Sequence, residues 1–164
     1  IGKDVAKGVK AKGSGIANLP YMERKADVIK GRELYINKCS SCHQKNGEGL
    51  KQSGQIAYLY PPLWGNNSYN DGAGMYRLGN FSGFIKNNMP KGVDHNTPLL
   101  SNEEAWDIAA FVNSQTRPHY DTSKDWPKIK EKAIDVPTGP YADNFSAEQH
   151  KYGPFGPIAK SKNK

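Results

Sequence analysis

The chain has few of the residues from which metal and redox sites are built. It contains two cysteines, three methionines and four histidines in 164 residues. A zinc site normally needs paired Cys or His ligands. Because there is no third cysteine and His95, His119 and His150 lie singly, we do not expect one. No run approaches the roughly 18 apolar residues of a membrane span, and no stretch alternates well enough to predict a convincing sheet.

Both cysteines fall in one motif, Cys39-Ser40-Ser41-Cys42-His43. In C-x-x-C-H the thiols lie close enough to bond the vinyl groups of one haem, and the next imidazole can reach the iron. The motif therefore predicts one covalently bound haem c, attached through its cysteines, with His43 as the proximal ligand. Half of a zinc site, a structural disulfide and a thioredoxin-like pair are the alternatives. The thioredoxin-like pair would need a β-α-β setting that the Lys- and Gly-rich flanks do not suggest.

Length and composition favour one domain with appendages. Because the apolar fraction is only 36%, we expect haem to supply a large part of the apolar core. Haem attachment needs reduced thiols in an exported compartment, so we expect a periplasmic location. The first residue is Ile1, with no signal peptide before it, which predicts a processed or trimmed start.

The formal net charge is +7, counting the polypeptide alone. A basic surface favours acidic protein partners or small anions through long-range attraction. The Lys and Arg residues are spread along the chain rather than clustered in one arm, so we expect no nucleic-acid partner. A solvated surface that serves only solubility is the alternative interpretation.

Three segments differ in character. Residues 1–24 are rich in Gly and Lys without a helical or strand period, which indicates a flexible or surface-draped arm. Residues 25–116 hold the haem motif and the clearest helices. Residues 117–164 contain six of the eleven prolines, which prevent long helices. Since this tail also carries aromatic residues such as Trp126 and Phe155, we expect it to pack on the domain in an extended form rather than to be disordered.

A helix is predicted after Asp27, which is a good N-cap residue, and through Cys39. Its inward face would hold Gly31, Leu34 and Tyr35, at the i, i+3 and i+4 positions. A glycine inside a helix costs about 1 kcal/mol relative to alanine. We therefore expect Gly31 to mark a close crossing with another helix.

The clearest helix is predicted at 102–116. Ser101 and Glu104 form a capping box at its start, and Pro118 disfavours helical backbone in the residue before it. One apolar stripe is expected to face the core: Ala105, Ile108, Ala109 and Val112.

Met89 is the candidate for the second axial ligand. It follows a short helix predicted near 82–88 and precedes Pro90. A thioether ligand stabilises ferrous iron and raises the potential relative to a second imidazole. The alternative is a core methionine. Met75 is expected to pack in the core, and Met22 falls in the arm.

Three further side chains lie near Met89 in the sequence. Lys86, Lys91 and His95 are close enough to replace it as a ligand if the loop rearranges. Each is expected to be an ordinary solvent-exposed side chain.

Pro61-Pro62-Leu63-Trp64-Gly65 is expected to lie beside the haem. The rigid carbonyl of Pro61 suits it to accept the Nδ1–H of His43 and fix the imidazole ring. Leu63 and Trp64 would cover a haem face or edge. An ordinary turn with buried hydrophobic residues is the alternative.

From about Lys25 to Arg117 the chain resembles class I cytochromes c in motif, ligand spacing and helix order. It is most similar to the C-terminal haem domain of thiosulfate dehydrogenases. The segments that carry this resemblance are 31–35, 61–65, 84–90 and 100–106, with 139–145 and 149–155 in the tail. The resemblance implies a mainly α, class I cytochrome c fold with an N-terminal arm and an extended Pro- and aromatic-rich C-terminal tail.

The resemblance also implies a role. Enzymes of that family carry two haems, and a cysteine thiolate binds the catalytic one. Here the motif uses both cysteines, so Cys39, Cys42, His43 and Met89 would hold the electron-relay haem, and we assign no catalytic residue. We expect single-electron transfer in thiosulfate or tetrathionate metabolism.

Two other functions stay open. One is the electron-accepting half, or a subunit, of a thiosulfate dehydrogenase or tetrathionate reductase; the other is a haem sensor with an open coordination site. The expected partner is a redox protein, with a second haem-bearing polypeptide as one candidate. A small sulfur oxyanion is a candidate ligand.

Overall fold

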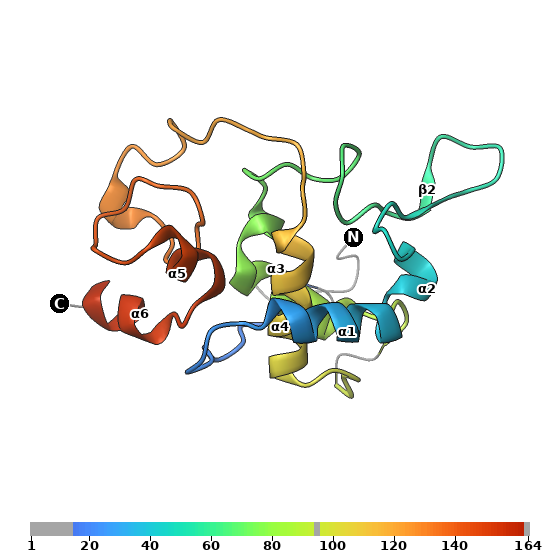
Figure 1. Ribbon diagram of the computed structural model, residues 1–164, viewed down its shortest axis with the longest axis horizontal. Helices are drawn as coiled ribbons and strands as arrows, with labels where there is room; N and C mark the ends of the chain where they lie inside the picture. Colours follow the sequence, from blue (N-terminus) through green and yellow to red (C-terminus); the bar gives the residue numbers. More distant parts are fainter. Residues whose placement is uncertain (1–14, 94–95, 163–164) are drawn as a thin grey trace, which may run out of the picture.

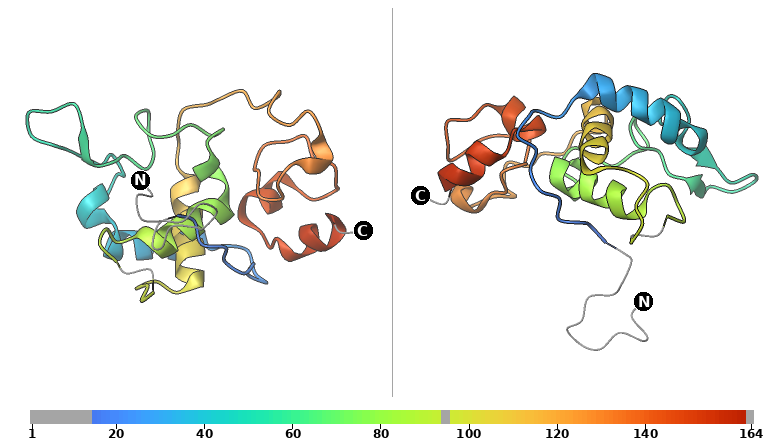
Figure 2. Two further views of the ribbon diagram at one scale, coloured as in Figure 1. Left: turned by 180° about the vertical axis from the view of Figure 1, so that it is seen from behind. Right: turned by 90° about the horizontal axis from the view of Figure 1, so that it is seen from below.

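Helices α1, α3 and α4 form the centre of the protein, with a small ribbon at one end and the C-terminal tail at the other (Figures 1 and 2). The structure is a computed structural model that describes residues 15–93 and 96–162. Its elements in chain order are α1 (Val28–Lys38), α2 (Ser40–His43), β1 (Leu50–Lys51), β2 (Tyr58–Tyr60), the 3-10 helix η1 (Gly74–Tyr76), α3 (Leu78–Asn88), α4 (Asn102–Ser114), the 3-10 helix η2 (Ile129–Glu131), α5 (Ala147–Tyr152) and α6 (Gly156–Lys162).

The start of α1 follows from its cap. The carboxylate of Asp27 accepts hydrogen bonds from the backbone N–H groups of Ile29 and Lys30, at 2.9 and 3.0 Å. Gly31 lies against α4, and a Cβ atom there would stand 1.9 Å from the carbonyl oxygen of Asp107. The predicted close helix crossing is confirmed, because only a residue without a side chain fits at this point.

Helix α4 has the predicted capping box of Ser101 and Glu104. The helix ends at Ser114 rather than at residue 116, because Gln115 already has extended backbone angles, with φ −79° and ψ 156°. The predicted apolar stripe is buried throughout: Ala105, Ile108, Ala109 and Val112.

Helix α3 is longer than expected, since it begins at Leu78 rather than near residue 82. Its N-cap residue, Arg77, makes no side-chain capping bond. The carboxylate of Asp135 in the tail instead accepts the backbone N–H of Gly79 at 3.0 Å. A cap supplied from so far along the chain leaves no local sequence signal.

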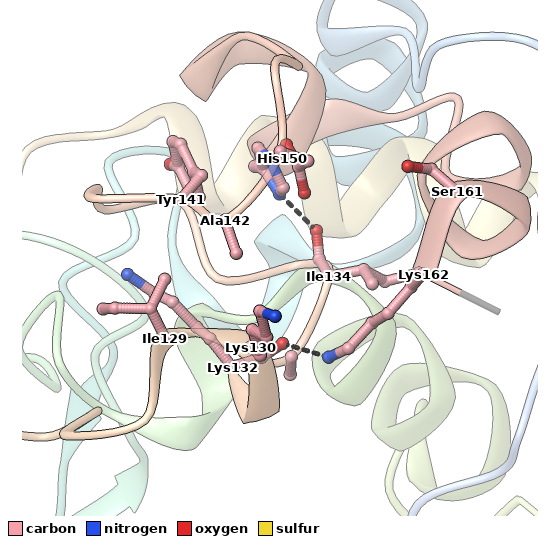
Figure 3. Close-up of a pocket in the computed structure, with 11 residues that line it drawn as sticks. Ile129, Lys130, Lys132, Ile134, Tyr141, Ala142, His150, Ser161 and Lys162 are labelled. Carbon is pink, nitrogen blue, oxygen red and sulfur yellow. Dashed lines mark hydrogen bonds and ion pairs between the residues drawn. The ribbon is translucent and has the colours of Figure 1, made fainter. Parts of the chain in front are cut away.

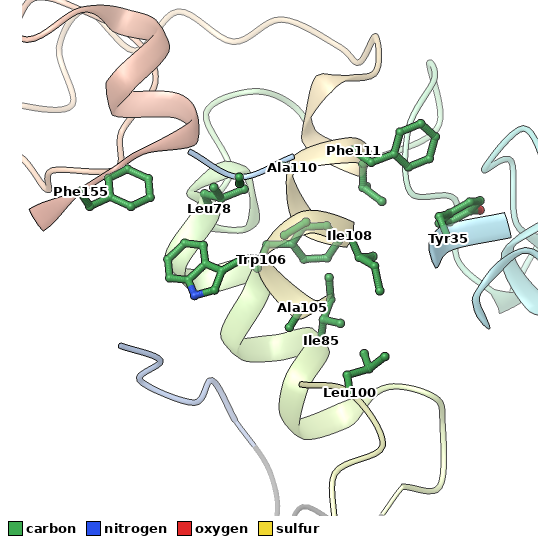
Figure 4. Packing of buried hydrophobic residues seen from close by; sticks show 14 of the residues in the cluster. Tyr35, Leu78, Ile85, Leu100, Ala105, Trp106, Ile108, Ala110, Phe111 and Phe155 are labelled. Carbon is green, nitrogen blue, oxygen red and sulfur yellow. The ribbon is translucent and has the colours of Figure 1, made fainter. Parts of the chain in front are cut away.

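The hydrophobic core lies between α1, α3 and α4 (Figure 4). Tyr35 from α1 and Trp106 from α4 are among its largest fully buried side chains. The tail contributes as well: the ring of Phe155 lies 5.7 Å from that of Trp106, centroid to centroid. The expectation that the tail packs on the domain agrees with this contact, although the tail also contains the short helices α5 and α6.

The N-terminal arm follows the surface where it is described. The N–H of Ala17 donates to the carbonyl of Gly83 at 3.1 Å, and the indole N–H of Trp106 donates to the carbonyl of Pro20 at 3.3 Å. Arg24 forms a bidentate pair with Asp107, at 2.8 and 2.9 Å. Residues 15–24 therefore drape over α3 and α4, while the rest of the predicted arm lies outside the described residues.

Strands β1 and β2 form a short antiparallel ribbon, with Leu50 paired to Tyr60 and Lys51 to Tyr58. This is the extent of β-structure in residues 15–93 and 96–162. Over the same residues, no helix is long and apolar enough to cross a membrane.

Candidate haem pocket

An apolar cleft runs between the C-x-x-C-H motif and the helices α3 and α4. Cys39, Cys42 and His43 lie on one side of its lining. The other side is formed by apolar residues of the core helices: Phe81, Phe84, Ile85, Ile108 and Val112. Met89 lines the same cleft. The fold thus brings the motif and the predicted second ligand, fifty residues apart in sequence, to one site.

One turn of backbone presents the motif to the cleft. The N–H groups of Cys42 and His43 both donate to the carbonyl of Cys39, at 3.2 and 3.0 Å. Both thiols are free and half-buried, and burial raises the pKa of the Cys39 thiol to about 11. In the described part of the chain, no group of three or more Cys, His, Asp and Glu residues could hold a metal ion.

His43 is buried, with 8% of its surface exposed. Its Nδ1 lies 3.0 Å from the carbonyl oxygen of Pro61. Because a carbonyl only accepts, Nδ1 carries the proton, and Nε2 keeps the lone pair that an iron atom needs. The structure places Pro61 where the sequence argument expected it, and its effect on a bound haem stays a prediction.

Met89 lies at the C-terminal end of α3. Its N–H donates to the carbonyl of Ile85 at 3.0 Å, and its own backbone is extended, so the chain leaves the helix at this residue. Met22 and Met75 are partly buried against the core and are not among the residues that line the cleft. Of the three methionines, Met89 is therefore the one that lines the cleft, and its role as a haem ligand stays a prediction.

The neighbours of Met89 differ from one another. Lys86 is half-buried rather than solvent-exposed, because its ammonium donates to the carbonyl of Leu100. Lys91 is exposed and lines the cleft. His95 lies outside the described residues.

Leu63 lines the cleft, whereas Trp64 is not among the residues that line it. The indole packs on Tyr35 and Phe111, with ring centroids 5.1 and 5.6 Å away. Gly47 packs directly against the indole of Trp64, because a Cβ atom at this position would stand 2.3 Å from the ring. The φ of Gly47, +65°, also favours glycine. Trp64 therefore supports the loop that follows the haem motif.

Tyr35 holds the other end of that loop. Its hydroxyl donates to the carbonyl of Gln44 at 2.7 Å. Gln44 follows His43 directly and has a φ of 65°, which is strained for a residue other than glycine. The sequence predicted Tyr35 as an inward-facing residue, but no signal identified this hydrogen bond.

The residues present fit a covalently bound haem. The cleft is apolar, its thiols stand on one turn, an imidazole offers Nε2 and a thioether lines the same space. These are the features that a c-type haem requires of its protein.

Comparison with known proteins agrees with this geometry. Residues 28–116 match the family model described as Cytochrome c. The thiosulfate dehydrogenase of Allochromatium vinosum is 44% identical over 119 residues, which cover 72% of this chain and 42% of that protein. The thiosulfate dehydrogenase of Thiomonas intermedia is 43% identical over 109 residues, covering 66% and 33%. The chain thus spans less than half the length of these curated relatives.

A solved structure is similar as well. Thiosulfate dehydrogenase (TsdBA) from Marichromatium purpuratum superposes with a TM-score of 0.60 at 33% identity, covering 80% of this chain and 26% of that one. The mainly helical fold is therefore that of a class I cytochrome c.

Proposed function

Because this chain belongs to the cytochrome c family, we propose that it is a monohaem electron carrier. A domain of this family holds haem c, whose iron supplies a one-electron Fe(III)/Fe(II) couple. Cys39 and Cys42 would attach a single haem, and His43 and Met89 would bind its iron. The observation that carries the proposal is that all four side chains line one apolar cleft.

Each residue would contribute to a site that changes little between oxidation states. The carbonyl of Pro61 holds the ring of His43 in one tautomer and one orientation. The sulfur of Met89 favours the ferrous state. The aromatic and aliphatic walls from α3 and α4, such as Phe81 and Ile108, exclude water. A fixed ligand set in a dry cleft suits electron transfer better than reaction with a small molecule at the iron.

We place this electron transfer in thiosulfate or tetrathionate metabolism. The relatives and the similar solved structure are thiosulfate dehydrogenases, which supports the proposal. Because Cys39 and Cys42 would both be used for attachment, no thiolate would be left to ligate an iron atom. The chain would therefore relay electrons rather than carry out the sulfur chemistry.

A second candidate is the electron-accepting part of a larger thiosulfate dehydrogenase. The chain matches only 42% and 33% of the length of two such enzymes, which favours this alternative. A steady-state assay with thiosulfate and an artificial acceptor separates the two. Activity that requires a second haem polypeptide supports the subunit, whereas turnover by the pure chain contradicts a simple carrier.

The partner proposed here is a redox protein with an acidic docking face, a second haem-bearing polypeptide being one candidate. The net charge of +7 supports it, and the association rate should then fall as ionic strength rises. We also propose an exported, periplasmic location, because attachment of haem to reduced thiols takes place in such a compartment.

The ligand set is tested by Met89→Ala, with Met75→Ala as the matched control. The ferric protein should show a far-red sulfur-to-iron charge-transfer band. The band should be lost in Met89→Ala, together with a fall in reduction potential, and kept in Met75→Ala. Persistence of the band in Met89→Ala would assign the ligand to another methionine. Intact mass should equal the polypeptide plus one haem, and a bare polypeptide after competent maturation would end the proposal.

A further inference from the structure

The C-terminal tail contains a cavity that is separate from the haem cleft. Its volume is about 420 Å³, and residues from η2, the segment before α5, α5 itself and the end of α6 line it. Figure 3 shows Ile129, Lys130 and Lys132 on one side and Tyr141 and His150 on the other. The ionisable side chains of the lining are mostly cationic: Lys130, Lys132, Lys162 and His150, with Asp143 and Tyr141.

Lys132 is a buried cation, with 7% of its surface exposed. Its ammonium donates to the carbonyl oxygens of Thr138 and Pro140 and lies 5.2 Å from the centre of the Tyr141 ring. Within residues 15–93 and 96–162 it forms no ion pair with a carboxylate. Burial lowers the pKa of Lys132. Buried lysines are usually paired with an acidic group, and Lys132 has carbonyl oxygens and a ring face in its place.

His150 is the partner of Asp143, whose carboxylate lines the cavity. The ring is 2% exposed, with Nδ1 2.7 Å from the carbonyl of Ile134 and Nε2 3.0 Å from Oδ1 of Asp143. A carbonyl can only accept, so Nδ1 donates to Ile134, and the contact between Nε2 and Asp143 then needs one proton that the two groups share. The His150–Asp143 pair is then neutral, and Asp143 does not offset the charge of Lys132.

The other lysines add positive charge at the rim. Lys130 and Lys162 are exposed, and the ammonium of Lys162 also donates to the carbonyl of Lys132. Three ammonium groups therefore belong to one cavity in which the carboxylate already has His150 as its partner. Apolar neighbours such as Ile129 and Ile134 reduce the access of water and so strengthen electrostatic attraction.

From these contacts we propose that the tail cavity binds a small divalent oxyanion. Several oxygens on one centre can accept from Lys132 and from the lysines at the rim at the same time, and a double negative charge would offset most of the lysine charge. Because Lys130 and Lys132 lie in and beside η2 and Lys162 lies in α6, the anion would join two segments of the tail that are distant in sequence. Binding to the folded state alone would raise thermal stability.

The proposal is tested on the holoprotein by calorimetric titration and thermal unfolding. Sulfate, thiosulfate and phosphate are compared with chloride at constant ionic strength. We expect a saturable rise of the melting temperature with the divalent anions. The double variant Lys130→Gln/Lys162→Gln changes only exposed side chains and should weaken affinity by about tenfold or more. Lys132→Gln should remove the saturable response.

The matched control is Lys124→Gln/Lys160→Gln, which removes two exposed lysines outside the cavity lining and should leave affinity unchanged. An equal loss in this control, or no saturable response to any of the anions, would overturn the site. A preference for thiosulfate would identify a sulfur oxyanion, and equal binding of all three a general oxyanion site. The haem absorption should not change on titration; a spectral shift with the same dissociation constant would assign the anion to the haem cleft instead.

Discussion

The haem domain and the C-terminal tail are held in place by different kinds of contact. In the domain, α1 and α4 approach closely at Gly31, and Tyr35 of α1 packs on Phe111 of α4, with ring centroids 5.4 Å apart. In the tail, buried polar side chains bind the backbone directly: Lys132 and His150 donate to carbonyl oxygens. The domain is built mainly on apolar packing, whereas the tail adds directed hydrogen bonds to the two buried apolar side chains that it contributes to the core, Phe155 and Ile158.

This difference bears on what each region can do. A cleft with apolar walls suits a large apolar cofactor, whereas charged groups buried beside a cavity suit a small ion. The tail also contributes fewer buried residues to the apolar core than the domain does, namely Phe155 and Ile158. We therefore expect substitutions in the domain to reduce global stability more than equivalent substitutions in the tail.

The largest effect is expected for Gly31→Ala. The new Cβ would stand 1.9 Å from the carbonyl oxygen of Asp107 and 3.0 Å from Cβ of Phe111, so α1 and α4 must separate. Overpacking of this kind lowers the free energy of unfolding by about 3 kcal/mol, which exceeds the gain of about 1 kcal/mol in helix propensity. Urea unfolding of the holoprotein measures the net change in the free energy of unfolding.

The control for this change is Gly156→Ala at the start of α6, where a Cβ would meet nothing within 4 Å. It should be neutral or slightly stabilising. If Gly31→Ala were as stable as Gly156→Ala, the close crossing would not be a determinant of the fold.

The next largest effect is expected for Asp107→Asn. This carboxylate is fully buried; it accepts from both terminal nitrogens of Arg24 and from the N–H of Asp27 at 2.8 Å. Loss of the charge leaves the guanidinium with a weaker partner. Because the Arg24 side chain is 40% exposed, water compensates in part, and we expect a loss of about 2 to 3 kcal/mol.

Glu103→Gln is the matched control, since Glu103 contacts the same Arg24 at 3.0 Å but has 62% of its side chain exposed. It should change stability by less than about 1 kcal/mol. Equal losses in the two variants would contradict the view that burial of Asp107 makes the difference.

Asp135 is the tail counterpart of Asp107. It contacts Arg77 at 2.7 and 2.8 Å and accepts the N–H of Gly79 in the first turn of α3. Asp135→Asn should lower the free energy of unfolding by about 1 to 2 kcal/mol. It should also increase amide exchange in the tail and in the first turn of α3, while the Met89 charge-transfer band is retained. Loss of that band would show that the tail and the haem cleft are not separable.

Two carboxylates, Asp27 and Asp135, show what the sequence predicts and what it does not. The start of α1 was predictable because its cap, Asp27, is adjacent to it in sequence, and the capping box at Ser101 is equally local. The start of α3 was not, because Asp135 supplies the bond to Gly79 from the other end of the chain. Local signals are readable from one sequence, and bonds between distant segments are not.

The candidate haem site shows the same difference between local sequence signals and contacts that only the fold creates. The motif from Cys39 to His43 and the choice of Met89 came from spacing, and the structure places them in one cleft. The walls of that cleft, Phe81 and Phe84 among them, were not predicted, because the sequence indicated only a short helix near 82–88. The lysines and His150 of the tail cavity carried no signal, because their roles depend on carbonyl groups that the fold brings to them.

The smallest effect is expected at His119, where the tail leaves the domain. Its Nδ1 lies 2.8 Å from Asp71 Oδ2, and hydrogen bonding to this carboxylate raises the pKa of His119 above 6.5. A raised pKa in the folded state means that the folded protein binds the proton more tightly. The stabilising contribution is therefore complete below the unfolded value of 6.5 and is lost as the pH rises through the folded pKa.

His119→Gln should accordingly lower the melting temperature slightly at about pH 5.5 and not at about pH 8.5. The side chain is 78% exposed, so solvent and salt screen the pair and the difference should shrink further at high ionic strength. Thermal unfolding of both proteins across this pH range measures it. A difference that grows with pH would mean that neutral, not protonated, His119 is the stabilising form. A pH-independent difference would mean that the ring contributes by packing alone, as Phe155 of the tail does against Trp106.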